Sequence, residues 1–230
     1  PYEVPNLMVD VHSPKSEVTV QWWRSVGSTH TAYATENFVD EIARATGKDP
    51  LELRRALLKN HPRHLAVLNL AAEKAGWGKP LPRGVHRGIA QFMGYGSYSA
   101  AVAEVSVNGR DVKVHRLVLA SNGGHAVNPA QIERQVAGLF VYGLSALFEQ
   151  ECTVKNGRIE QTNFDTFNSM RIAQMPKVET IVIEGGGQEW GGIGEPTICV
   201  AAPAVLKAIY RATGECLRSV PLRHMGSTLV

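Results

Sequence analysis

The sequence is poor in the features that mark several common classes of protein. Its 230 residues include only three cysteines. These are widely spaced and form no CxxC pair, which gives no support to a disulfide framework, a zinc site or an iron–sulfur site. Lysine and arginine exceed aspartate and glutamate by only 24 − 21 = 3, and no basic run carries interleaved aromatics, so nucleic acid is not an expected partner. No apolar run approaches membrane-spanning length.

What remains is the composition of an ordinary globular protein, 44% hydrophobic and 20% charged, with enough residues for one or two cores. The chain begins at Pro1, without an initiator methionine or a signal-peptide pattern. We therefore expect a processed product or a part of something larger, and the compartment stays undetermined.

The first part of the chain, 1–84, is predicted to be a mainly helical segment preceded by strands. Apolar alternation predicts strands over 7–12 and 17–22. A helix is predicted over 36–46, with Thr35 as its cap and Phe38 on its apolar face. A second helix starts at Asp49 and Pro50, and a third is closed by Gly76.

The remainder, 85–230, has a different pattern, in which strands and helices mix. Asn108–Gly109 and Asn156–Gly157 each indicate a hairpin, and Asn128–Pro129 opens a helix that runs to about residue 148. A buried strand is predicted over 179–183 and a closing helix over 201–213. The fold class is therefore α+β, with mixed sheets and hairpins packed against helices.

Between that strand and the closing helix lies a loop, 184–196, with six glycines and one carboxylate, Glu195, followed by a proline. Glycine lets the backbone approach a ligand closely. The loop either shapes backbone around a bound group or is a flexible surface loop with an incidental glutamate. In a partly dehydrated, glycine-lined pocket, Glu195 would suit the task of a general base near neutral pH.

Two further polar residues have both a functional and a structural interpretation. Arg24 stands among tryptophans and glycines, so it is either an anion or carbonyl contact or an arginine stacked on tryptophan at the surface. Gln135 lies among apolar helix neighbours, where its amide either bonds local backbone or meets a polar cofactor.

Other chemistry has weaker support. His61 and His64 could face one way, but no third ligand lies nearby, so a solvated helix end is favoured over a metal site. There is no GxSxG elbow for serine hydrolysis. The glycines of 94–98 and 185–187 lack the strand–loop–helix spacing of a phosphate-binding loop.

Several motifs in consistent order resemble the molybdenum hydroxylases, the xanthine dehydrogenase and aldehyde oxidase family. The branch most similar contains the isoquinoline 1-oxidoreductase beta subunit. The motifs are Trp23-Arg24-Ser25-Val26-Gly27-Ser28, Ala126-Val127-Asn128-Pro129, Gln135-Val136-Ala137-Gly138 and Gly191-Gly192-Ile193-Gly194-Glu195-Pro196.

This resemblance implies an oxidoreductase that adds a water-derived oxygen to a carbon of an aldehyde or an N-heterocycle (azaarene). The implied cofactor is molybdenum held by molybdopterin cytosine dinucleotide, bound through the pterin with no protein ligand to the metal. Glu195 would be the general base and Arg24 would orient or polarise substrate. Gln135, Gly192, Ile193 and Gly194 would line the cofactor, with Gly96 and Ser97 beside it.

The resemblance also implies partners. A second pterin-gripping loop and the remaining pocket segments of the family are missing, so we expect a longer molybdopterin-binding chain or fragment to complete the site. Iron–sulfur clusters or haem would reside only on an electron-transfer subunit. A bacterial cytoplasmic or periplasmic location is implied. The alternative is a non-catalytic scaffold or assembly subunit that keeps the fold, and a third possibility, a nucleotide-binding domain, lacks the necessary loop spacing.

Overall fold

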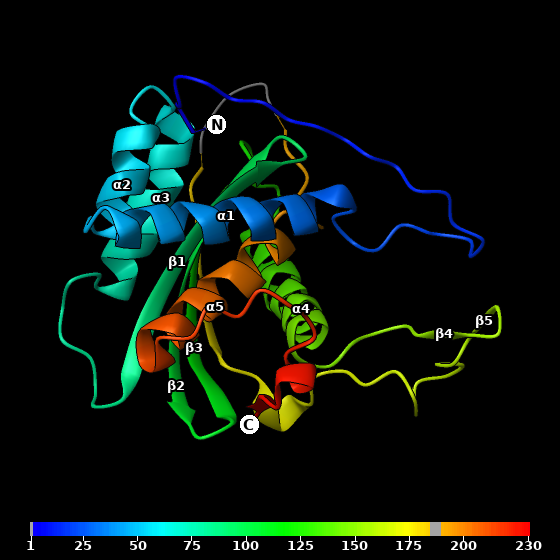
Figure 1. Cartoon of the computed structure of the whole chain (residues 1–230). Coiled ribbons are helices and arrows are strands. Elements are labelled where there is room, and N and C mark those ends of the chain that lie inside the picture. The colour runs from blue at the N-terminus through cyan, green and yellow to red at the C-terminus, as the bar shows by residue number, and fades with distance from the viewer. Residues whose placement is uncertain (1, 185–189) are drawn as a thin grey trace.

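A computed structural model describes residues 2–184 and 190–230. Its centre is a twisted mixed sheet in which β1 (Val85–Gly94), β2 (Ser97–Asn108) and β3 (Asp111–Asn122) are antiparallel neighbours. Both β6 (Lys177–Val182) and the short β7 (Thr228–Leu229) pair with β3 in parallel. Long meandering strands carry side chains alternately to the two faces, and both faces are covered (Figure 1).

One face of the sheet packs against α4 (Pro129–Phe148) and α5 (Ile198–Thr213). Alanines of β2 such as Ala101 and Ala103 let these helices approach closely, and Phe140 and Val205 fill the fully buried centre of this core. The helix predicted to follow Asn128–Pro129 is α4, in which Val136, Phe140, Leu144 and Leu147 are buried and Ile132 packs on the core. The closing helix begins at Ile198, three residues earlier than predicted.

The other face packs against α3 (Pro62–Ala75), with α2 (Pro50–Leu57) beside it. As predicted, Asp49 caps α2, because its carboxylate accepts from the backbone of Leu51 and Glu52. Gly76, in the left-handed conformation, ends α3. This second core joins residues on both sides of residue 84, and the division of the chain there stays a prediction. The α+β class itself is confirmed.

The helix α1 (Gly27–Ala45) crosses the front of α5 in Figure 1. It starts nine residues before the predicted helix, so Thr35 is an interior residue and not a cap. The buried face is also different: Val39 and Ala43 are buried, whereas Phe38 is 63% exposed. Glu36 and Asn37 occupy buried positions of this helix. Because these buried residues are polar, the spacing of apolar residues in the sequence does not indicate which face of the helix is buried.

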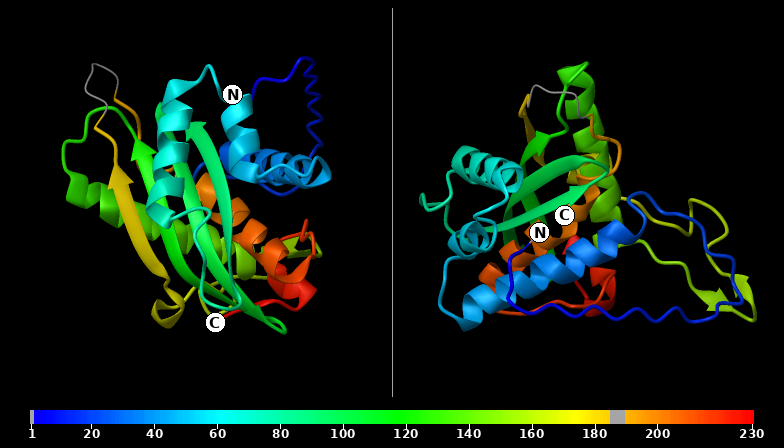
Figure 2. Two further views of the ribbon diagram at one scale, coloured as in Figure 1. Left: turned by 90° about the vertical axis from the view of Figure 1, so that its left-hand side faces the viewer. Right: turned by 90° about the horizontal axis from the view of Figure 1, so that it is seen from above.

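Two long extended segments reach away from the layers in Figures 1 and 2. The strands predicted over 7–12 and 17–22 are not formed, and Val9, Val11 and Trp22 are at least 75% exposed. A strand needs a neighbour for its backbone hydrogen bonds, and no described strand lies beside this segment. The other segment holds β4 (Val154–Lys155) and β5 (Arg158–Ile159), the predicted hairpin at Asn156–Gly157.

The strand predicted at 179–183 exists as β6, but its residues are half-buried rather than buried, because β6 pairs with a neighbour on one side only. The hairpin predicted at Asn108–Gly109 joins β2 to β3 as expected, although Gly109 and Arg110 are its central residues. Short 3-10 turns at Ile172–Gln174 (η1) and Leu222–Met225 (η2) complete the chain. None of the helices in the described part is both long and apolar enough to cross a membrane.

His64 joins α3 to the sheet and gives the fold a pH dependence. The ring is buried, and its Nδ1 lies 2.6 Å from Gln91 Oε1. Burial lowers the pKa of His64, so the unfolded chain takes up a proton at a higher pH than the folded chain. We expect the free energy of unfolding to fall as pH falls below about 6.5, by at most about 1.4 kcal/mol per pH unit.

Urea denaturation from pH 7.5 to 5 measures this effect. His64→Gln, which keeps a hydrogen-bond donor toward Gln91, should flatten the curve, while the same change at exposed His12 should leave it as in the parent chain. An equally steep decline in the His64 variant would show that other groups are responsible.

Candidate functional site

The loop that follows β6 is fixed to the ends of three strands. The backbone N–H of Gly191 donates to the carbonyl oxygen of Gly123 at 2.7 Å. The backbone N–H of Gly192 donates to the carbonyl oxygen of Tyr95, also at 2.7 Å. Trp190 forms a bridge with Gly124. The loop therefore rests between the β1–β2 turn and the end of β3. Of the glycines that singled out this loop, Gly185, Gly186 and Gly187 lie outside the described residues.

The described glycines of the loop have two different surroundings. A Cβ on Gly191 would come within 2.3 Å of Ser97 Oγ and 2.6 Å of the Gly96 carbonyl oxygen, so no side chain fits there. A Cβ on Gly194 would meet nothing within 4 Å, and one on Gly192 would make only ordinary contact with Tyr95. Glycine thus allows close packing at one end of the loop and leaves backbone accessible at the other.

Arg24 connects this loop to α4. Its Nε donates to the carbonyl oxygen of Gly194 at 2.7 Å, and its terminal nitrogen Nη2 donates to Gln135 Oε1 at 2.8 Å. Its guanidinium lies over the ring of Tyr142, 5.7 Å from the ring centre, while Trp23 packs on the same ring. Both structural interpretations from the sequence need correction: Arg24 lies over a tyrosine, and Gln135 is exposed rather than a buried amide.

Glu195 is held by the residue that follows Arg24. The backbone N–H of Ser25 donates to Glu195 Oε1 at 2.9 Å, and Ser25 Oγ donates to the Glu195 carbonyl oxygen at 2.5 Å. Ser25 and Val26 have φ of 74° and 48°, a region that non-glycine and especially β-branched residues rarely adopt. This strained turn aims the Ser25 N–H at the carboxylate, and such strain is found most often at functional sites. Nothing in a Ser–Val pair reveals a positive φ, so sequence reasoning missed Ser25.

The neighbours of Glu195 show its electrostatic influence. Partial burial and the Glu195 carboxylate raise the pKa of the Tyr95 phenol. In the first turn of α5, Cys199 has a pKa raised to about 11, chiefly by burial, with Glu195 adding to the shift. Both neighbours therefore stay neutral near pH 7.

Several polar groups at the site have no partner among the residues that the structure describes. Ser97 Oγ, which lies against Gly191, is buried and unbonded. In the same described set, neither the backbone N–H groups of 193–195 nor the amide nitrogen of Gln135 donates a hydrogen bond. Glu195 Oε2 likewise accepts none there. Unpartnered buried hydroxyls are uncommon and call for a ligand or water.

These donors, together with the accessible backbone at Gly194, fit a polar, anionic organic cofactor such as a pterin carrying phosphates. The structure thus brings Arg24, Gln135, Gly194 and Glu195 together by direct bonds, and places Gly96 and Ser97 against the same loop through Gly191. Gly192 and Ile193 lie between them. The functional roles of all these residues remain predictions.

His61 and His64 do not join this site. His64 bonds Gln91 as described above, and His61 lies 3.6 Å from Glu3 Oε1. Within residues 2–184 and 190–230, no cluster of three or more His, Cys, Asp and Glu side chains could hold a metal ion.

Known proteins resemble this chain in sequence and in fold. The family model of the molybdopterin cofactor-binding domain matches residues 4–176, a stretch that ends before Glu195. The chain is 31% identical to the isoquinoline 1-oxidoreductase beta chain from Brevundimonas diminuta over 96% of its own length and 29% of the relative's. It is 26% identical to one subunit of the nicotinate dehydrogenase from Pseudomonas putida, covering 96% of this chain and 20% of that protein.

The solved aldehyde oxidoreductase from Desulfovibrio gigas shares the fold, with a TM-score of 0.66 and 13% identity over 86% of this chain and 40% of that chain. The chain spans less than a third of the length of the two curated relatives named above.

Proposed function

The chain belongs to the molybdopterin cofactor-binding family of the molybdenum hydroxylases, and from this premise we propose that it forms the general-base wall of a molybdenum hydroxylase active site. The observation that carries the proposal is a connected set of hydrogen bonds: Ser25 donates to Glu195, and Arg24 donates both to Gly194 of the same loop and to Gln135. Residues 24–25, 135 and 194–195 are far apart in the sequence and are joined at this loop, an arrangement that an incidental surface glutamate does not require.

Each residue of the chain has a distinct task in this proposal. The Ser25 N–H fixes Oε1 of Glu195, which leaves Oε2 to receive a proton from the oxygen nucleophile. Arg24 donates a hydrogen bond to the Gly194 carbonyl oxygen and so fixes the position of the loop that carries Glu195. The amide nitrogen of Gln135, the hydroxyl of Ser97 and the N–H groups of 193–195 would hold the cofactor. When bound, the molybdenum–pterin group supplies the centre that accepts two electrons from the substrate.

The substrate class follows from the names of the relatives, which refer to isoquinoline, nicotinate or aldehydes. We assign an aldehyde or an N-heterocycle that gains a water-derived oxygen at carbon. The family resemblance supports the cytosine dinucleotide form of the cofactor. It also supports a longer partner segment completing the pocket, an iron–sulfur or cytochrome subunit as electron acceptor, and activity only in that assembly.

Elemental and pterin analysis of the undissociated, active complex tests this function. We expect about one molybdenum and one pterin nucleotide per copy of this chain, together with oxidation of aldehydes or azaarenes. Replacing both Arg24 and Gln135 by alanine should lower cofactor content, because the loop loses its connection to α4, whereas alanine at exposed Arg134 on the same helix should retain it. An active, intact complex without molybdenum would refute the proposal and leave the scaffold alternative.

A further inference from the structure

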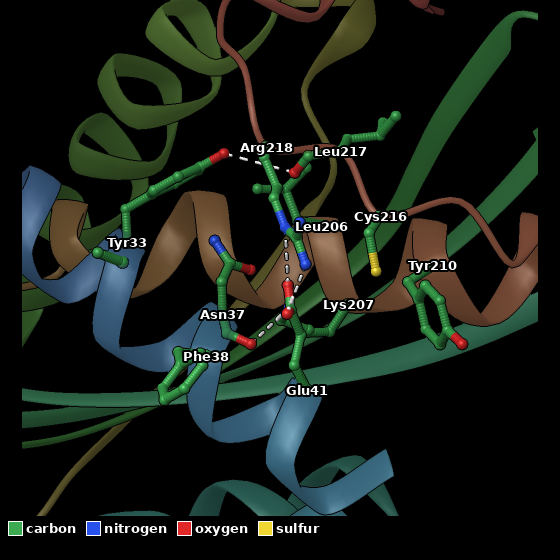
Figure 3. A pocket seen from close by; sticks show the side chains of 11 residues that line it. Tyr33, Asn37, Phe38, Glu41, Leu206, Lys207, Tyr210, Cys216, Leu217 and Arg218 are labelled. Carbon is green, nitrogen blue, oxygen red and sulfur yellow. Dashed lines mark hydrogen bonds and ion pairs between the residues drawn. The ribbon is translucent and has the colours of Figure 1, made fainter. Parts of the chain in front are cut away.

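A cavity whose lining includes no residue of the Glu195 loop contains a polar group without a partner among the described residues. It has a volume of about 440 Å³ and is formed by the middle of α1, the last turns of α5 and the segment 216–218 (Figure 3). The side chain of Asn37 is one of its walls. Asn37 is 9% exposed, and neither its Oδ1 nor its Nδ2 has a hydrogen-bond partner in the part of the chain that the structure describes.

The groups around Asn37 are already engaged with each other. Lys207, 7% exposed, donates from Nζ to the main-chain oxygen of Asn37 at 3.2 Å. Glu41 and Arg218 form a two-fold ion pair, with oxygen–nitrogen distances of 3.1 and 2.7 Å. Tyr33 donates from its hydroxyl to the Leu217 carbonyl oxygen at 3.4 Å. The Asn37 amide is bonded to none of these groups, and leaving it unpaired costs about 1–3 kcal/mol.

The chemistry of that amide selects the kind of ligand. An asparagine side chain offers a donor and an acceptor side by side. A carboxylate or phosphate would satisfy Nδ2 but leave Oδ1 facing another acceptor. A secondary amide satisfies both, because its C=O accepts from Nδ2 while its N–H donates to Oδ1.

The apolar walls of the cavity are consistent with a ligand whose secondary amide belongs to a polypeptide main chain. Leu206 and Leu217 line the interior, and Phe38 is 63% exposed at the same cavity. An extended peptide places its side chains on alternate sides of its main-chain amides, so one amide could meet Asn37 while an apolar side chain packs on Phe38 and Leu206. In the matched relatives more than two thirds of the polypeptide lies outside the aligned part, so protein chain is available beside this domain.

We propose that this Asn37 cavity binds an extended polypeptide segment of a partner chain by pairing one of its main-chain amides with the Asn37 side chain. The site shares no hydrogen bond with the described part of the Glu195 loop. The proposal does not depend on the cofactor chemistry proposed above, and either can fail without the other.

The test uses the 230-residue chain, with binding followed by ¹H–¹⁵N NMR shifts. The probes are N-acetyl-leucine N-methylamide, a blocked tetrapeptide with the same leucine, and 4-methylpentanoate, which has the apolar group and an anion but no N–H. We expect the blocked amide to shift the signals of 33–41 and 206–218, the tetrapeptide to bind more tightly, and the carboxylate not to bind. Tighter binding of the carboxylate, or no gain from the longer peptide, would overturn the assignment.

Asn37→Leu separates recognition from folding. It removes both polar atoms, which have no described partner to lose, and keeps the main-chain oxygen that Lys207 uses. We expect unchanged or higher thermal stability and affinity for the tetrapeptide weakened about tenfold or more. Asn60→Leu, the same change at an exposed site, should alter neither. Unchanged peptide affinity in the Asn37 variant, or a marked fall in its melting temperature, would contradict the proposal.

Discussion

Replacement of Glu195 by glutamine is expected to lower kcat of the assembled enzyme about a thousandfold, within the 10²–10⁴ range that general-base catalysis supplies. Glutamine has the same shape, and its Oε1 still accepts from the Ser25 N–H at the observed 2.9 Å position. What it lacks is the ability to take up a proton at the second position. The loss should therefore appear in kcat, with little change in melting temperature or in molybdenum content.

Glu184→Gln is the matched control, because Glu184 is exposed on the same connection between β6 and α5 and makes no described contact with the Glu195 cluster. We expect it to retain activity within about twofold. Activity of the Glu195 variant within tenfold of the parent enzyme would remove the carboxylate from the proposed mechanism. A variant that loses its molybdenum would instead indicate a binding role.

The approach of Arg24, Gln135 and Glu195 to one another was predictable in part. The residues themselves were identified from motifs, since glycines beside a carboxylate and an arginine between tryptophan and glycine are unusual locally. The hydrogen bonds that connect them could not be predicted from the sequence, because the bonded residues are 111 and 170 positions apart. Only the packing of α1, α4 and α5 around the sheet brings them together. Ser25 was missed for a different reason, the positive φ that its identity does not disclose.

Secondary structure was predicted well where local chemistry decides it. Asp49 and Pro50 start α2, Gly76 ends α3 and Asn156–Gly157 turns a hairpin because each residue favours that geometry by itself. The failures occurred where tertiary context decides. The alternating segment 7–12 has no described strand to pair with, and the face of α1 is set by the buried polar residues Glu36 and Asn37 rather than by Phe38.

The buried polar face of α1 leads to the second large effect, on stability. Arg54 of α2 is fully buried and donates to Glu36 Oε2 at 2.9 Å, to Asp40 Oδ1 at 2.8 Å and to the carbonyl oxygens of Glu36 and Pro50. Glu36, 1% exposed, also accepts from the hydroxyl of Tyr2 and the backbone N–H of Gln91. Arg54→Met would leave this carboxylate buried without its cation, and we expect a loss of about 3–5 kcal/mol in the free energy of unfolding.

Urea denaturation at pH 7 measures that loss, with Arg55→Met as the control. Arg55, one residue along α2, pairs with Glu52 and Asn69 in a partly exposed position and should cost less than about 1 kcal/mol. Adding Glu36→Gln to the Arg54 variant should recover part of the stability, because the unpaired buried charge is removed. Equal losses for the two arginine variants would mean that the cluster does not hold α1 to the sheet. Because Ser25 lies just ahead of α1, a genuine loss of this anchor should also impair the alignment of Glu195, so that stability and activity decline together.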